Sequence, residues 1–172
     1  MAFVVQTDGS VVENANSYVP VDYANTYHSD RGNTAWTGTD EVKQAALIKA
    51  TDYIEQTYYG RWIGYPTEAN QPLSWPRSYH DPELYYTDFD IAGTIPDKLK
   101  QAVCILALES IGGDELNPAK TQTVKREKVD VIEVEYMAGN EGGRTGTTRP
   151  AIDGILRKLL TGSSLNARVV RV

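Results

Sequence analysis

The clearest helical pattern of hydrophobic and polar residues lies in the segment 39–60. Its apolar stripe has the spacing i, i+3, i+7 and i+11, formed by Leu47, Ala50, Ile54 and Tyr58. Thr39 can cap the start of this helix, and Gly60 can end it. Asp52 and Glu55 fall away from the stripe, so we expect both carboxylates on the solvent-facing side of the helix.

A second strong helix is predicted from Thr94, as its cap, through Pro96 at its start to Gly112-Gly113 at its end. The stretch from Ala102 to Leu108 is apolar almost all round, which is typical of a helix at the centre of its domain. Cys104 lies in this stretch and is therefore expected in the core.

Two shorter helices complete the helical pattern. One starts near Pro20 and stops at Gly32. The other covers 150–160, with one apolar side made of Ile152, Ile155, Leu156 and Leu159. Between the helices lies a long segment, Arg61 to Gly93, without clear periodicity, and its two tryptophans, Trp62 and Trp75, are expected to hold it to the body.

Alternating patterns predict two β-units. The dipeptide Asp8-Gly9, between apolar ends, favours an N-terminal hairpin. The stretch "VKREKVDVIEVEYM", 124–137, carries seven charges among β-branched residues, and its alternation changes phase near Asp130-Val131. A turn or bulge there gives a basic first arm and an acidic second arm, whose opposed charges can pair. A lone two-stranded hairpin is marginal in water, and both its outer edges would remain open.

Together these patterns predict a mainly α fold, a small bundle of about four helices with a β-hairpin and a long loop. We expect one domain over 1–161, including the N-terminal hairpin. A flexible C-terminal arm, 162–172, follows across the Gly162 to Ser164 hinge.

The composition narrows the functional classes. The net charge of −6 and pI of about 4.9 argue against strong non-specific binding to nucleic acid or to an anionic membrane. A single cysteine excludes an intrachain disulfide. The N-terminus lacks the features of a secretory signal, and the longest apolar run is too short to span a bilayer, so we expect an intracellular protein without a membrane partner.

No catalytic or cofactor-binding pattern is present in the sequence. His28 and His80 are the only histidines, and His28 is expected at the surface or as a helix C-cap. Two histidines without a cysteine cluster do not make a zinc site, so neither a metal nor a cofactor is predicted. The basic run "VKREK" lacks the interleaved aromatic residues that single-strand binders use. We therefore predict a protein that is not an enzyme.

Several blocks, taken in order, carry a family resemblance. They are "NANSYV", "YHSDRGNTAW", "ALIKATDYIEQ", "YYGRWIG", "LSWPR", "VKREKVDVIEVEY" and "RPAIDGILRKLL". Over about Asn14 to Leu160, the chain resembles tailed-phage proteins often labelled DnaT-like single-stranded DNA-binding. These are similar to head-to-tail adaptors, also called connector or head-completion proteins. The chain departs from the usual pattern in the long insertion Tyr79 to Gly93 and in Pro20, where a small capping residue is common.

The resemblance implies a ring of identical subunits, commonly twelve, beneath the portal of the virion at the head–tail junction. The ring extends the DNA channel, through which double-stranded DNA passes without specific binding. The implied partners are further copies of the chain, the portal protein and a tail-side stopper or tail-terminator protein. Assembly takes place in the host cytoplasm.

In such a ring, each hairpin can pair with a neighbouring subunit. The predicted subunit-interface residues are Arg126, Lys128, Ile132, Val134 and Tyr136. The C-terminal arm is predicted to dock onto the portal by strand addition through Arg168, Val169, Val170, Arg171 and Val172. A disordered terminus is the competing interpretation of the arm.

Two other functions stay open. The first is single-stranded DNA binding of the DnaT-like type, against which the acidic balance counts. The second is a small hydrolase in an unfamiliar fold, although the sequence shows no pair of nucleophile and base.

Overall fold

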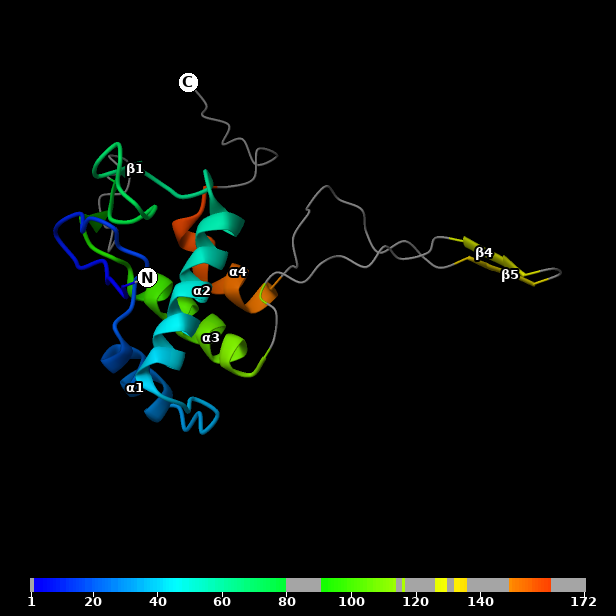
Figure 1. Ribbon diagram of the computed structural model, residues 1–172. Helices are drawn as coiled ribbons and strands as arrows, with labels where there is room; N and C mark the ends of the chain where they lie inside the picture. Colours follow the sequence, from blue (N-terminus) through cyan, green and yellow to red (C-terminus); the bar gives the residue numbers. More distant parts are fainter. Residues whose placement is uncertain are drawn as a thin grey trace, which may run out of the picture. The chain divides into compact units, whose positions relative to one another are not determined.

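The computed structural model describes residues 2–79, 91–113, 116, 126–129, 132–135 and 149–161. The chain divides into two compact units (Figure 1). Unit 1 consists of 1–116 and 149–172, and unit 2 consists of 117–148. The single domain expected over 1–161, with its separate arm, stays a prediction.

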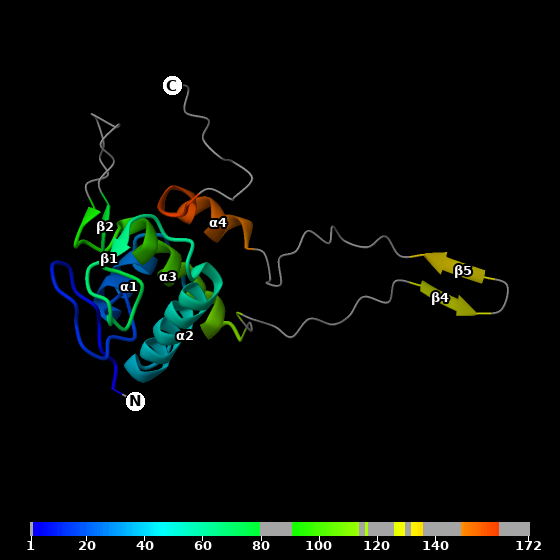
Figure 2. The same ribbon diagram turned by 90° about the horizontal axis from the view of Figure 1, so that it is seen from above.

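In its described residues, unit 1 contains four α-helices and a short 3₁₀ helix, which confirms the predicted small helical bundle. Their bounds are α1 Val21–Ser29, α2 Asp40–Tyr58, α3 Asp97–Ile111, α4 Pro150–Leu156 and η1 Arg157–Leu159. Helix α3 packs against α1, α2 and α4, and its largest contact is with α2 (Figures 1 and 2). Within the described ranges, no helix has the length and apolar character needed to cross a membrane.

The predicted stripe of α2 is confirmed. Leu47, Ala50, Ile54 and Tyr58 are all buried, with exposed fractions of 0 to 1%. Thr39 occupies the N-cap position, although its side chain makes no capping hydrogen bond. Gly60 adopts a φ of +70°, the left-handed conformation that glycine allows just beyond a helix.

Helix α3 is central, as predicted, but it starts later than expected. Pro96, not Thr94, is its N-cap, because a fixed φ and a missing N–H suit the position where no intrahelical partner exists. The helix ends with Gly112 as its C-cap, whose backbone N–H donates to the carbonyl of Leu108. Cys104 is fully buried, and burial raises the pKa of its thiol to about 12. The thiol is therefore a core group, as predicted.

The long segment that follows α2 folds onto the bundle through aromatic packing. Trp62 and Trp75 are buried, with exposed fractions of 4% and 0%, and their ring centroids lie 5.8 Å apart. Tyr58 packs against Trp62 at 5.7 Å. From α4 and η1, Ile152, Leu156 and Leu159 enter the same core. The anchoring role predicted for the two tryptophans is confirmed.

The same segment contains a small antiparallel sheet. Its strands are β1 Tyr65–Pro66, β2 Arg77–Tyr79 and β3 Ile91–Ala92, in the order β1-β2-β3. Ser78 is the central residue, paired with Tyr65 on one side and Ala92 on the other. The part of the long loop that is described is thus folded on itself.

The predicted N-terminal hairpin is wrong. Asp8-Gly9 does form a turn, with a φ of +85° at Gly9, but residues 2–17, all of them described, contain no strand. The buried side chain of Gln6 instead takes up the backbone groups of the turn. Its amide nitrogen donates to the carbonyl of Ser10 at 2.5 Å, and its oxygen accepts from the N–H of Val12 at 3.0 Å. Hydrogen bonds of the Gln6 side chain thus stand in place of the backbone-to-backbone hydrogen bonds that would define a hairpin.

The predicted surface position of His28 is also wrong. Its side chain is only 1% exposed, and its ring stacks on that of Trp36 at 4.5 Å. Nδ1 of His28 lies 3.0 Å from the amide nitrogen of Asn33. The connection after α1 folds back over the helix, because the indole N–H of Trp36 donates to the side-chain oxygen of Asn25. This fold-back covers a histidine that helix position alone would leave in water.

The described part of unit 2 is the predicted β-hairpin. Strands β4 Arg126–Val129 and β5 Ile132–Glu135 run antiparallel. Val129 pairs with Ile132, so β4 ends and β5 begins on either side of the position where the change of phase predicted a turn. The ladder brings Arg126 opposite Glu135 and Lys128 opposite Glu133. The predicted opposition of a basic and an acidic arm is confirmed for these two pairs.

Replacing Leu106 by alanine should lower the free energy of unfolding by about 2–5 kcal/mol, because the side chain is fully buried in the central helix. Urea unfolding followed by far-UV circular dichroism measures this change. Val42→Ala is the control, since Val42 is 49% exposed on α2 and should change stability by less than about 0.5 kcal/mol. Equal effects of the two variants would contradict the central position of α3.

The burial of His28 should make stability depend on pH. Burial, aided by the positive charge of Arg31, lowers the pKa of His28 from 6.5. Below about pH 6.5 the unfolded chain therefore binds a proton that the folded chain does not, and the free energy of unfolding should fall. In His28→Gln, whose amide oxygen can accept from Asn33, this part of the pH dependence should disappear. Superimposable pH profiles of the two proteins would refute the prediction.

Candidate functional site

A polar network at the side of α2 involves a residue that the sequence placed in solvent. The half-buried carboxylate of Glu55 accepts a hydrogen bond from the Tyr18 hydroxyl at 2.5 Å. Its other oxygen accepts two bonds from Ser74, at 3.0 Å from the backbone N–H and 2.6 Å from the hydroxyl. The expectation of a simple solvent-facing carboxylate is therefore wrong for Glu55.

The network holds the segment after α2 to the N-terminal part of the chain. The hydroxyl of Tyr18 also accepts from the backbone N–H of Trp75 at 3.1 Å. Burial, and then the negative charge of Glu55, raise the pKa of Tyr18 well above its ordinary value. The phenol thus stays protonated and donates to Glu55. This arrangement has a structural role, because every group in it bonds to another part of the chain.

Arg77 holds the turn of the same segment through backbone carbonyls. Its Nε donates to the carbonyl of Ile63 at 2.8 Å, and one Nη donates to that of Gly64 at 2.6 Å. The other Nη donates to the carbonyl of Ser74 at 3.3 Å. Residues 63–64 and 74 are thereby kept close to each other.

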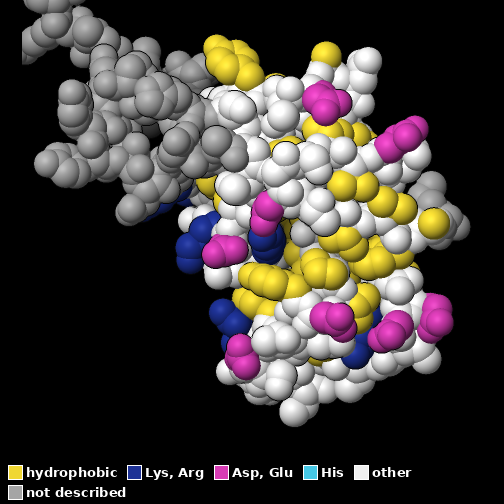
Figure 3. Space-filling model, turned by 90° about the vertical axis from the view of Figure 1, so that its left-hand side faces the viewer, with side chains coloured by type: hydrophobic (Ala, Val, Ile, Leu, Met, Phe, Trp, Pro, Cys, Tyr) yellow, Lys and Arg dark blue, Asp and Glu magenta, His cyan; other side chains and the backbone are white. Residues whose placement is uncertain are grey.

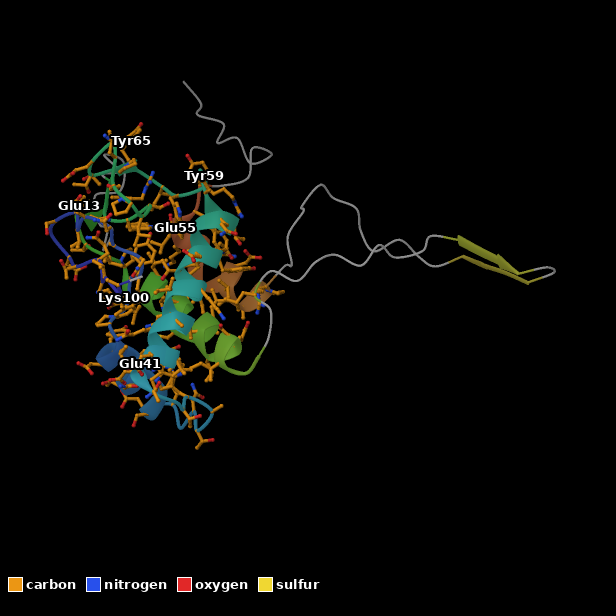
Figure 4. The ribbon with its side chains drawn as sticks, in the orientation of Figure 1. Glu13, Glu41, Glu55, Tyr59, Tyr65 and Lys100 are labelled. Atoms are coloured by element: carbon orange, nitrogen blue, oxygen red, sulfur yellow. The ribbon has the colours of Figure 1, made fainter. Side chains whose placement is uncertain are left out.

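An open pocket of about 380 Å³ lies beside this network. Its lining is partly aromatic and proline-rich, and partly polar: Glu55, Tyr59, Gly60, Trp62, Pro66, Ala69, Gln71, Pro72, Leu73, Ser74 and Arg77. Tyr59 lines the pocket directly, whereas Tyr65 is the residue that precedes Pro66, another residue of the lining. Each of the two tyrosines is 81% exposed. Figure 4 shows both at the same end of unit 1, with Glu41 at the other end.

Two distant segments that carry positively charged residues are held side by side by backbone hydrogen bonds. The carbonyl of Arg61 accepts from the backbone N–H of Thr161 at 2.7 Å, and the N–H of Ile63 donates to the carbonyl of Leu159 at 3.0 Å. These bonds bring η1, with the exposed residues Arg157 and Lys158, beside the segment that carries Arg61. We call the group Tyr59, Arg61, Tyr65, Arg157 and Lys158 the tyrosine–arginine surface.

The tyrosine–arginine surface was not predicted from the sequence, because the basic run "VKREK" has no interleaved aromatic residues. The signal lay in "YYGRWIGY", where Tyr59, Arg61 and Tyr65 follow one another within seven positions. On the face of the molecule in Figure 3, acidic and basic side chains are both spread among hydrophobic ones.

Four of the predicted interface residues lie in the hairpin of unit 2. Arg126 and Lys128 belong to β4, and Ile132 and Val134 belong to β5. Tyr136 and the predicted portal-binding residues lie outside the described part of the chain, the latter being Arg168, Val169, Val170, Arg171 and Val172. The roles of all these residues stay predictions.

The two chain segments that lead into and out of unit 2 are joined within unit 1. Arg149 forms an ion pair with Glu109 of α3 and donates to the carbonyl of Leu116 at 3.4 Å. Its guanidinium also lies 5.4 Å from the centroid of the Tyr53 ring. Leu116 and Arg149 are the residues of unit 1 that flank unit 2 in sequence. The chain therefore leaves unit 1 and returns to it at two positions that these contacts hold.

Among the residues that the structure describes, no group of three His, Cys, Asp or Glu side chains could hold a metal ion. The histidine in that part of the chain, His28, is engaged with Asn33 and Trp36. The features with functional potential are therefore the hairpin of unit 2 and the tyrosine–arginine surface of unit 1.

These features define a small helical-bundle protein with a charged β-hairpin placed in sequence between α3 and α4. The family model described as "Putative DnaT-like ssDNA binding protein" matches residues 1–172, and the chain belongs to this family. The comparisons with curated proteins and with solved structures gave no match. Of the three functions considered from the sequence, the family description names single-stranded DNA binding and not the adaptor role.

Replacing Glu55 by alanine should destabilise the protein by about 1–3 kcal/mol, because the buried Tyr18 hydroxyl and two donors of Ser74 lose their acceptor. Thermal and urea unfolding measure the loss. Asp52→Ala is the matched control on the exposed side of the same helix, with an expected change below about 0.5 kcal/mol. A Glu55 variant as stable as the control would mean that the network is dispensable.

Proposed function

We propose that the protein is a structural head-to-tail adaptor of a tailed bacteriophage, which forms a ring under the portal and extends the DNA channel. The observation that carries this proposal is the hairpin of unit 2. It forms a compact unit of its own, and in the described residues its sheet contains only β4 and β5.

A two-stranded hairpin of this kind needs further partners to be stable. Isolated hairpins are marginal in water, and each outer strand edge presents unpaired N–H and C=O groups. In a closed ring of identical subunits, the edge of one hairpin meets a surface of the next subunit, and no edge remains free. Arg126, Lys128, Ile132, Val134 and Tyr136 are the proposed interface residues.

Charge in the hairpin favours the observed pairing of β4 with β5, and thereby the strand edges that the hairpin would offer to a neighbouring subunit. The ladder opposes Arg126 to Glu135 and Lys128 to Glu133, whereas a one-residue shift would set Glu127 opposite a glutamate. Such repulsion disfavours wrong partners more than it adds affinity for the correct one. The ion pair of Arg149 with Glu109 supports the same role, because it fixes to α3 the residue at which the chain returns from unit 2.

The net charge of −6 supports a channel protein that lets DNA slide, since phosphate contacts gain affinity from cations. The ordered blocks shared with head-to-tail adaptors supply the phage context. We further propose that the portal and a tail-side stopper or terminator are its partners, and that Arg168 to Val172 dock onto the portal. The protein would act without catalysis, at the head–tail junction of the virion.

Single-stranded DNA binding is the second candidate function. The description of the family favours it more directly than the adaptor role. The overall acidic charge opposes it, so a binding site would have to be a local concentration of cations.

The hairpin register makes the adaptor proposal testable by a charge exchange. In Lys128→Glu, position 128 would face the like charge of Glu133, and ring formation should weaken. The exchange Lys128→Glu/Glu133→Lys restores opposite charges and should recover the ring. The measurement is the mass of complexes formed with the portal protein of the same phage, by mass photometry and negative-stain microscopy.

In the same experiment, the wild-type protein tests the adaptor proposal itself. If it forms no ring, either alone or on the portal, the adaptor proposal is wrong. If it forms a ring that both hairpin variants also form at wild-type yield, the ring contact lies elsewhere than the hairpin.

A further inference from the structure

We infer that the tyrosine–arginine surface of unit 1 binds single-stranded DNA, with bases stacked on Tyr59 and Tyr65 and phosphates beside Arg61, Arg157 and Lys158. This inference rests on the second candidate function and gives it a location.

The two tyrosines are unusual in their exposure. Among the described residues, large hydrophobic side chains are exposed at three positions, and Tyr59 and Tyr65 are two of them. Burial of an aromatic ring contributes more than burial of most side chains, so a ring left 81% exposed is available for a partner. Unstacked nucleobases are suitable partners because each base has a flat π-face.

The two tyrosines lie on one segment of the chain at the same end of unit 1 (Figure 4). The open pocket at this end is lined by Tyr59 and by Pro66, the neighbour of Tyr65. The hydrogen bonds of Arg77 to Ile63 and Gly64 hold the chain that separates them. The two rings are therefore carried by a segment with a fixed backbone.

The charges at this end of unit 1 differ from those of the whole chain. Arg61 lies on one of two segments that backbone hydrogen bonds hold side by side, and the exposed residues Arg157 and Lys158 lie on the other, although the chain has a net charge of −6. Two acidic groups of the adjoining helices are engaged within unit 1: Glu55 of α2 accepts from Tyr18 and Ser74, and Asp153 of α4 accepts from the Tyr58 hydroxyl at 2.8 Å. Glu68, exposed in the loop after β1, is the carboxylate that would limit the affinity.

Single-stranded DNA fits this surface better than a duplex. A duplex presents its phosphates but keeps its bases stacked inside, so it would leave both tyrosines without partners. Three cations also provide few phosphate contacts, which predicts modest affinity with a shallow salt dependence.

Fluorescence anisotropy with labelled oligo(dT) of about 20 nucleotides tests the inference, because a homopolymer isolates stacking and charge from base pairing. Tyr59→Ala/Tyr65→Ala should weaken binding about 5-fold or more for each ring removed. Tyr59→Phe/Tyr65→Phe keeps both rings and should bind like the wild-type protein. Circular dichroism confirms that each variant is folded, which is expected because both side chains are exposed.

The cations are tested by the slope of affinity against salt. Arg157→Ala/Lys158→Ala should reduce the magnitude of that slope by about 1.4, since each single-strand phosphate contact contributes about 0.7. The control Lys49→Ala/Lys98→Ala removes two exposed lysines of α2 and α3 and should leave the slope unchanged.

The outcomes separate the inference from the function on which it rests. If the wild-type protein does not bind oligo(dT) at all, single-stranded DNA binding fails as a function, and the exposed tyrosines are left as a surface for a protein partner. If it binds but the alanine variants bind equally well, only the location is wrong. Equal or tighter binding of a duplex would also overturn the stacking arrangement.

Discussion

The burial of α3 is the constraint on which the rest of this structure depends. Its stretch of small and medium apolar residues, with Ala102, Val103 and Ala107 fully buried, lets α2, α1 and α4 all pack against one helix. Small side chains permit close approach of helix axes, and close approach keeps water out. Because unit 2 lies between α3 and α4 in the sequence, the contact between these two helices also brings together the chain segments that lead into and out of unit 2.

The second determinant is the polar attachment of the segment after α2. Packing of Trp62 and Trp75 supplies the free energy of burial, but it does not by itself fix the path of the backbone between them. Glu55, Tyr18 and Ser74 fix that path by hydrogen bonds, and Arg77 fixes the neighbouring turn. The positions of Tyr59 and Tyr65 on the surface are consequences of this network.

The two candidate functions use different parts of the molecule, so they do not exclude each other. The adaptor proposal depends on strand edges in unit 2, whereas DNA binding would depend on exposed rings and cations of unit 1. The acidic composition of the chain would keep any contact with DNA local. A modest affinity for single strands would not bear on the adaptor proposal, which concerns the passage of double-stranded DNA.

The sequence by itself determined the four helices and the hairpin of unit 2. Periodicity reports which side of an element is apolar, so the stripe of α2 and the phase change at Asp130-Val131 could be read directly. Tertiary structure decided the positions that depend on contacts between distant segments. His28 is buried because Trp36 folds over it, Gln6 replaces a hairpin ladder, and Glu55 finds Tyr18 and Ser74 far away in the chain. The tyrosine–arginine surface likewise exists only because the backbone of Arg61 pairs with that of Thr161, a contact that no local pattern encodes.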